Sequence, residues 1–193
     1  SVVSDQVKWS MQVTRNASAF NLASSALSLD KDSAFVKKFL IEGGVKAEQI
    51  TLGTPMTNEV WQQNAQAPKE YTVSQSISVS CDDVEKISNI SKATQPILSQ
   101  GIIFTTLSLE YYYSKLPELR VSLLASAVAD AKARAQEIAR SGGKKVGDLK
   151  SASSGVVQVL SAGSTEVSDY GSYNTAEINK EVMVTVKATF NTR

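Results

Sequence analysis

Apolar and polar residues alternate in three stretches of the chain, which is the pattern of β-strands with one buried and one solvated face. From Val7 to Thr14 every odd position is apolar and every even position is polar. The same parity recurs from Tyr71 to Cys81, whereas between Val182 and Phe190 the apolar residues take the even positions. Strands with one wet face predict antiparallel sheets that carry helices on the opposite face.

Two longer stretches place apolar residues at helical spacing. The first runs from about Ser18 to Glu42 and the second from Leu119 to Arg140, and each is followed by a pair of glycines. A shorter helix is expected after Asp82-Asp83, whose carboxylates suit a cap and a first turn, with a break or bend near Pro96. We expect each long helix to lie along a full strand and to bury its apolar stripe there.

The order of these elements occurs twice. Gly43-Gly44 and Gly142-Gly143 mark matching points about 99 residues apart, and Ile50 and Leu149 have the same separation in the strands that follow. Each copy reads βαββ. A repeat of this period is too long for a solenoid and indicates a duplicated domain.

The predicted fold class is therefore α+β, with duplicated βαββ units, a linking helix, and antiparallel sheets that carry long helices packed on one face. We expect a single compact domain over residues 1–193. Within it the first repeat spans about residues 3–81, the linking helix about 82–100, and the second repeat about 101–193.

Composition argues against several classes of function. The chain has 20 basic and 19 acidic residues, so it lacks the basic footprint of a nucleic-acid-binding protein, and no nucleic-acid partner is expected. It has no His, which removes the commonest general base and metal ligand. With one Cys, a zinc site is not expected and a Ser-His-Asp or Cys-His arrangement is impossible within the chain. We therefore expect no enzyme activity, no catalytic residue, no metal and no cofactor.

Three local features have structural interpretations. Ser141–Gly147 combines glycines with lysines, but it follows a helix instead of preceding one, so we expect a left-handed helix end rather than a phosphate loop. The acidic residues Asp82, Asp83 and Glu85 suit a helix N-terminus without any metal. Cys81 ends an apolar strand face and is expected to be buried as a small hydrophobe.

Exposed aromatic residues are the candidate interaction sites. They are Trp61, Tyr111, Tyr112, Tyr113, Tyr170 and Tyr173. The three consecutive tyrosines fit either an ordinary strand edge or a contact surface, because tyrosine is common in both. The polar segments Gln62–Lys69 and Ser161–Asn179 precede the last strand of each repeat, and the second is a candidate for ordering on a partner or a neighbouring subunit.

Arg120 is expected in the first turn of the second long helix, where the helix dipole disfavours a cation. Two interpretations remain open. One is a structural salt bridge to a carboxylate of the neighbouring sheet, and the other is an anion site.

The run from Leu119 to Ala139, followed by Gly143 and Gly147, resembles the signature of the SIMPL-domain family. The shared features are an arginine that opens the helix, an Ala-Val-x-Asp-Ala core around Asp130, and a Gly-x-x-x-Gly exit into a strand. The similarity extends over almost the whole chain, including the strand that contains Trp9 and the closing strand after Lys180.

The resemblance implies a protein of the bacterial cell envelope that associates with itself or binds partners. The family includes periplasmic and outer-membrane-associated proteins, among them a periplasmic immunogenic protein that forms a large channel-like oligomer, and some members are linked to oxidative-stress tolerance. It implies no catalytic residue for this chain. The chain begins at Ser1, almost inside a strand, and we expect an upstream signal or anchor to be missing.

Two functions of different class follow as hypotheses. The first is a non-enzymatic envelope module that forms a homo-oligomer through strand edges, hairpin tips and tyrosines, with membrane association only through the missing upstream segment. The second is a binding protein for a small molecule or cell-wall fragment, held in a cleft between the two repeats.

Overall fold

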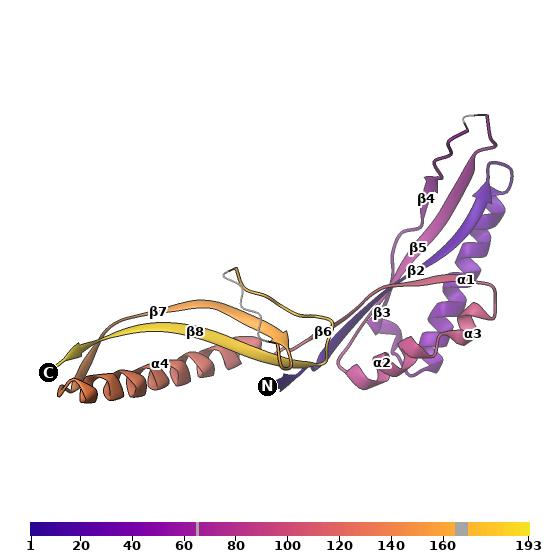
Figure 1. Cartoon of the computed structure of the whole chain (residues 1–193). Coiled ribbons are helices and arrows are strands. Elements are labelled where there is room, and N and C mark those ends of the chain that lie inside the picture. Colours follow the sequence, from indigo (N-terminus) through magenta and orange to yellow (C-terminus); the bar gives the residue numbers. More distant parts are fainter. Residues whose placement is uncertain (65, 165–169) are drawn as a thin grey trace. The chain divides into compact units, whose positions relative to one another are not determined.

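The computed structural model describes residues 1–64, 66–164 and 170–193. The chain divides into two compact units. The N-terminal unit is Asp5–Tyr112, and the C-terminal unit combines Ser1–Ser4 with Tyr113–Arg193. Both contain helices and antiparallel strands, so the predicted α+β class is confirmed (Figure 1). In the described residues no helix is both long and apolar enough to cross a membrane.

The N-terminal unit is built on an antiparallel sheet with strand order β3-β5-β2-β6. Its central strands β2 (Gln6–Ser18) and β5 (Glu70–Cys81) pair along their whole lengths. The short strands β3 (Ile50–Leu52) and β4 (Met56–Glu59) both pair with β5, and β6 (Ile103–Tyr112) pairs with the other edge of β2. Both edges of β2 are therefore occupied.

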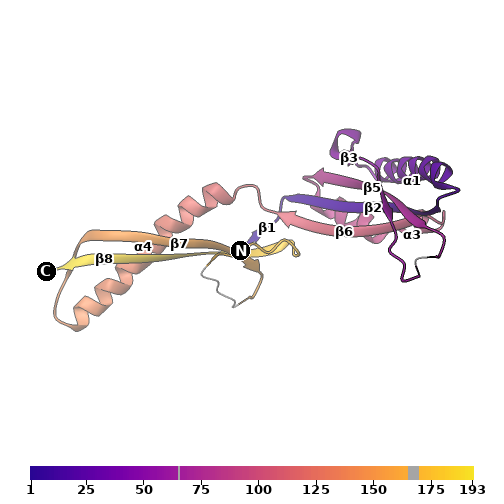
Figure 2. The same cartoon turned by 90° about the horizontal axis from the view of Figure 1, so that it is seen from above.

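The helices of the N-terminal unit bury the apolar face of this sheet. Helix α1 (Leu22–Glu42) packs along β2 and β5 (Figure 2), and α2 (Val84–Lys92) and α3 (Gln95–Leu98) add the fully buried Ile87 and Ile97. The odd residues of β2 are buried, as the alternation predicts. They are Val7, Trp9, Met11 and Val13. One solvated face and one helix-covered face result.

The C-terminal unit is a helix packed on a long hairpin. Helix α4 (Leu116–Ser141) contacts β7 (Val146–Ser161) and β8 (Asn179–Thr192), and the two-residue strand β1 (Val2–Val3) pairs with the first residues of β8. The even positions of β8 that were predicted to be apolar and inward are half-buried. No residue of α4 is fully buried, so this layer is less enclosed than the core of the N-terminal unit.

Both long helices end on a glycine in the left-handed region. Gly44 has φ +90° and Gly143 has φ +70°. After each glycine the backbone closes onto the helix, since Val45 N–H donates to Leu40 O at 3.0 Å and Lys144 N–H donates to Ala139 O at 2.8 Å. The predicted helix end at Ser141–Gly147 is thus confirmed.

Helix starts differ from the predicted ones. Strand β2 continues to Ser18, whose N–H donates to Asn21 Oδ1 at 2.6 Å, so α1 begins at Leu22 and Phe20 lies in the turn before it. Near Pro96 the predicted break occurs instead of a bend, because α2 ends at Lys92 and Pro96 lies in the first turn of α3, where a proline starts a helix. Pro117 plays the same part in α4, which begins at Leu116.

The two units do not coincide with the two predicted repeats. Strand β6, expected to open the second repeat, pairs with β2 and belongs to the N-terminal unit, so the unit boundary falls between Tyr112 and Tyr113 and not near residue 101. Pairing with β6 satisfies the backbone groups along the second edge of β2. The order strand, helix, strands is nevertheless present in both halves of the chain.

Candidate functional site

The aromatic candidates of the N-terminal unit have different surroundings. Trp61 follows β4 and is 83% exposed, as expected for a contact residue. Tyr111 is only 6% exposed and pairs with Val7, so its ring belongs to the core rather than to a contact surface. Tyr112 is half-buried, and its carbonyl accepts from Asp5 N–H at 3.0 Å. Of these three residues, Trp61 alone is freely presented to solvent.

Phe20 is an exposed aromatic residue that the sequence pattern does not reveal. It is 96% exposed and belongs to the β2–α1 connection, which lies at the same end of the N-terminal unit as the β4–β5 connection that contains Trp61 (Figure 1). The pairing of Ser18 with Glu70, and the hydrogen bond from Val60 N–H to Glu70 O at 2.8 Å, bring the two turns together. The expected helix from Ser18 placed Phe20 inside a helix, which hid this position.

In the C-terminal unit Tyr173 takes part in an internal cluster. Its Oη accepts from Tyr113 N–H at 3.1 Å, and Lys180 Nζ lies 5.7 Å from the centre of its ring. The chain around it is bound to β7, because Val159 N–H donates to Ser172 O at 2.7 Å and Asn174 N–H donates to Val159 O at 2.8 Å. These contacts of Tyr173 are all made within its own chain.

Lys180 holds this cluster together. Its side chain is fully buried, and Nζ donates to the carbonyl oxygens of Asn174 and of Glu177, the latter at 2.7 Å. Burial lowers the pKa of Lys180 below its ordinary value, and the negative charge of Glu177 opposes that shift. Tyr170 is 97% exposed nearby, while residues 165–169 of the predicted partner-binding segment Ser161–Asn179 lie outside the described residues.

Arg120 lies in the second turn of α4 because Pro117 starts the helix three residues earlier than predicted. The dipole penalty expected for a first-turn cation is correspondingly smaller. Arg120 is exposed, and in the described part of the chain it makes no ion pair. It lines an open cavity of about 530 Å³ with Leu116, Val121, Leu124 and Val157. The expected salt bridge from Arg120 to a sheet carboxylate is not found among the residues that the structure describes.

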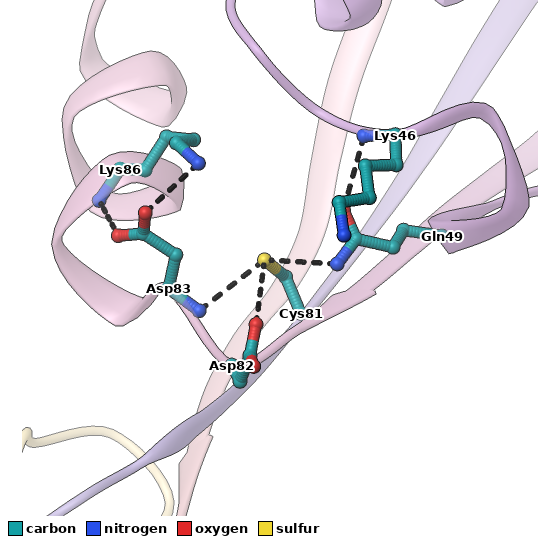
Figure 3. A network of polar contacts seen from close by, with 6 residues as sticks. All are labelled: Lys46, Gln49, Cys81, Asp82, Asp83 and Lys86. Atoms are coloured by element: carbon teal, nitrogen blue, oxygen red, sulfur yellow. Dashed lines mark hydrogen bonds and ion pairs between the residues drawn. The ribbon is translucent and has the colours of Figure 1, made fainter.

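Cys81 is the centre of a polar network at the end of β5 (Figure 3). The buried sulfur accepts from Asp83 N–H at 3.3 Å and from Gln49 Nε2 at 3.4 Å, and the thiol donates to Asp82 Oδ1 at 3.8 Å. Gln49 in turn accepts from Lys46 N–H at 3.0 Å. The thiol therefore connects the end of β5 to the start of α2 and to the short helix η1 (Ala47–Gln49).

The acidic residues beside Cys81 cap α2, as predicted. Asp83 is the N-cap, and its carboxylate accepts from Lys86 N–H at 3.0 Å and pairs with Lys86 Nζ at 2.8 Å. Hydrogen bonds from the Lys86 side chain and then from its backbone lower the pKa of Asp83, and the same side-chain bond raises the pKa of Lys86. In the described residues no group of three possible metal ligands is present.

The arrangement around Cys81 has a structural role. An open cavity of about 400 Å³ lies beside the thiol and is lined by Gln6, Lys8, Gln49 and Tyr112 among others. The chain contains no His to deprotonate a thiol. The sulfur accepts hydrogen bonds from the backbone at the start of α2 and from Gln49, and these bonds position α2 and η1 at the end of β5.

We predict that Cys81 reacts with an aromatic disulfide reagent on the order of 100-fold more slowly in the native protein than in urea, because a buried thiol reacts only when the local structure opens. Stopped-flow absorbance measures both rates. Ser24→Cys in a Cys81→Ala background is the control, since position 24 is exposed and should react equally fast in both conditions. Equal native and unfolded rates at Cys81 would contradict its burial.

Comparison with known proteins adds one finding. A family model described as SIMPL, a protein of unknown function (DUF541), matches residues 1–190. No curated protein matches the chain.

Proposed function

The chain belongs to the SIMPL family, whose model covers residues 1–190, and on that premise we propose that it is a non-enzymatic cell-envelope module that associates with copies of itself. The family description assigns no function. The proposal therefore rests on the physical features of this chain, and above all on an unpaired strand edge in the C-terminal unit.

Strand β8 carries that edge. One side of β8 pairs with β7 along most of its length, whereas the other side pairs with β1 only at Asn179 and Lys180. In the described residues the edge from Glu181 to Thr192 therefore has no strand beside it. Unpaired backbone N–H and C=O groups along such an edge favour pairing with a strand of another molecule.

The helix of the same unit supports this proposal. Helix α4 exposes the apolar residues Val121 and Ile138, and the other apolar residues of its stripe are only half-buried against β7 and β8. In the N-terminal unit, by contrast, α1 has six buried residues, among them Leu29, Val36 and Leu40. An incompletely covered helix and hairpin gain apolar burial when a second copy packs against them.

The remaining parts of the proposal have separate support. The absence of His from the sequence favours a non-enzymatic role, because the commonest general base is lacking. The envelope location and the link to stress follow from the resemblance to periplasmic and outer-membrane-associated family members. A periplasmic location is tested by cell fractionation of the full-length protein.

The assembly proposal predicts a solution mass that is a multiple of the 20.7 kDa chain. Size-exclusion chromatography with light scattering measures it. We expect Thr185→Lys to weaken the association by about 10-fold or more, because a lysine on an exposed edge position opposes strand pairing. Thr185 is exposed on the face of β8 away from α4, so the change leaves the hairpin intact.

Ala34→Lys is the matched control. It adds the same charge at an exposed position of α1 in the N-terminal unit, and it should leave the mass unchanged. A monomer at all concentrations, or an oligomer that Ala34→Lys and Thr185→Lys weaken equally, would contradict assembly through the β8 edge.

A further inference from the structure

One end of the N-terminal unit presents two aromatic residues almost entirely to solvent. We call this end the aromatic tip and define it by Phe20, in the turn between β2 and α1, and Trp61, in the connection between β4 and β5. Figure 1 shows both connections at the same end of the unit. Their exposures of 96% and 83% mean that neither ring is used in the core. Large exposed aromatic residues grouped at one site mark a binding surface.

The aromatic tip carries no charge of its own. The sequence from Asn16 to Leu29 contains no Asp, Glu, Lys or Arg, and neither do Val60–Asn64 and Gln66–Pro68. Of the charges that border the second turn, Lys69 pairs with Glu59 at 3.1 Å, and Glu70 at the start of β5 adds one negative charge. Burying the tip in a less polar medium therefore desolvates no unpaired charge from these two turns.

The two turns rest on rigid supports. The β2–β5 pairing continues up to Ser18 and Glu70, directly beneath both turns. The hydrogen bond from Val60 N–H to Glu70 O holds the residue before Trp61 against β5, and the one from Ser18 N–H to Asn21 Oδ1 closes the turn that contains Phe20. Because both rings lie next to these anchored residues, placing them in a binding surface costs little conformational entropy.

We propose that the aromatic tip inserts into the interfacial region of a lipid bilayer with zwitterionic headgroups. Trp and other aromatic side chains favour this depth, because a ring fits the boundary between headgroups and acyl chains. Each exposed Lys or Arg would add attraction to anionic lipid, and the two turns have none. The neutral tip thus matches a surface without net charge. This inference departs from the expectation that membrane association comes only from an upstream segment, and it does not depend on self-association.

The test uses vesicles of phosphatidylcholine and the fluorescence of the two tryptophans. Trp9 is fully buried and should not respond, so a blue shift on adding vesicles reports Trp61. We expect a blue shift and quenching of the fluorescence by brominated phosphatidylcholine. Co-sedimentation should be unchanged by 0.5 M salt or by anionic lipid, because salt does not screen a hydrophobic contact. Phe20→Ser and Trp61→Ser should each weaken co-sedimentation by about 5-fold or more.

Tyr170→Ser is the matched control, because it removes an aromatic side chain that is 97% exposed in the C-terminal unit and should leave co-sedimentation unchanged. Thr185→Lys should also bind vesicles normally, which separates this proposal from the assembly proposal. Absence of co-sedimentation, binding that requires anionic lipid, or full binding by Trp61→Ser would overturn the inference. A blue shift that appears without vesicles as the protein concentration rises would also overturn it, since a second copy would then cover the tip.

Discussion

Replacing Trp9 with alanine is expected to lower the free energy of unfolding of the N-terminal unit by about 4 kcal/mol. Trp9 is the largest fully buried side chain of the chain's described part. Its Nε1 donates to Thr106 Oγ1 at 3.1 Å, and its ring meets that of Phe104 edge to face, with centroids 6.1 Å apart. The substitution removes apolar burial, leaves a cavity between α1 and the sheet, and breaks the link from β2 to β6.

Urea unfolding followed by far-UV circular dichroism measures this effect. Trp61→Ala is the control, because it deletes the same side chain at an exposed position and should change the free energy of unfolding by no more than about 0.5 kcal/mol. A loss below about 1 kcal/mol for Trp9→Ala would show that its site collapses around the missing ring or that the ring is not in the core.

The strands and long helices could be predicted because burial acts on single faces of single elements. In β2 the alternation from Val7 to Val13 records which side chains face α1, so the pattern identifies both the strand and its inner face. The same holds for α1, whose Leu29, Val36 and Leu40 lie on one stripe. Such local patterns carry their meaning without knowledge of the partner element.

The division into units could not be predicted in this way. The alternation in β6 shows that it is a strand, but not that β2 is the strand beside it. Periodicity reports which face is buried, whereas the choice of neighbour depends on which backbone edges are free in the whole fold. A repeat in sequence therefore predicted the elements correctly without predicting which unit contains β6.

The candidate site was predictable only where exposure follows from local sequence. Trp61 stands beside a polar segment and is exposed, but Tyr111 and Tyr173 look equally available in sequence and make internal contacts. Phe20 shows the opposite error, since the sequence placed it inside a helix whereas the structure exposes it in a turn. The turn exists because the β2–β5 pairing extends to Ser18, so that α1 begins only at Leu22. Exposure of an aromatic residue near an element boundary thus depends on tertiary pairing.

The ion pair between Arg15 and Asp32 is the second feature on which the N-terminal unit depends strongly. Two nitrogens of the Arg15 guanidinium donate to the carboxylate of Asp32. They are Nε and one terminal nitrogen, and the terminal nitrogen lies 2.8 Å from Asp32 Oδ1. The pair ties β2 to the middle of α1. The hydrogen bond from Arg15 to Asp32 raises the pKa of Arg15, burial opposes the shift, and the attraction of the two charges adds to it.

The two partners of this pair differ in exposure, and the cost of removing each should differ accordingly. The side chain of Asp32 is 9% exposed, whereas that of Arg15 is 35% exposed. We expect Arg15→Met to lower the free energy of unfolding by about 3 kcal/mol, because it leaves a buried carboxylate without its partner. Asp32→Leu should cost less, about 1 kcal/mol, because the guanidinium of Arg15 can turn toward water.

The double variant Arg15→Met/Asp32→Leu should recover most of the loss of Arg15→Met, because no buried charge then remains and the two apolar side chains can pack together. Urea unfolding of all three variants at pH 7 measures this coupling. Lys38→Met is the control, since it breaks the exposed pair with Glu42 on the same helix and should cost no more than about 0.5 kcal/mol. A double variant as unstable as the sum of the single ones would mean that the pair contributes through packing of its separate side chains and not through the burial of opposite charges.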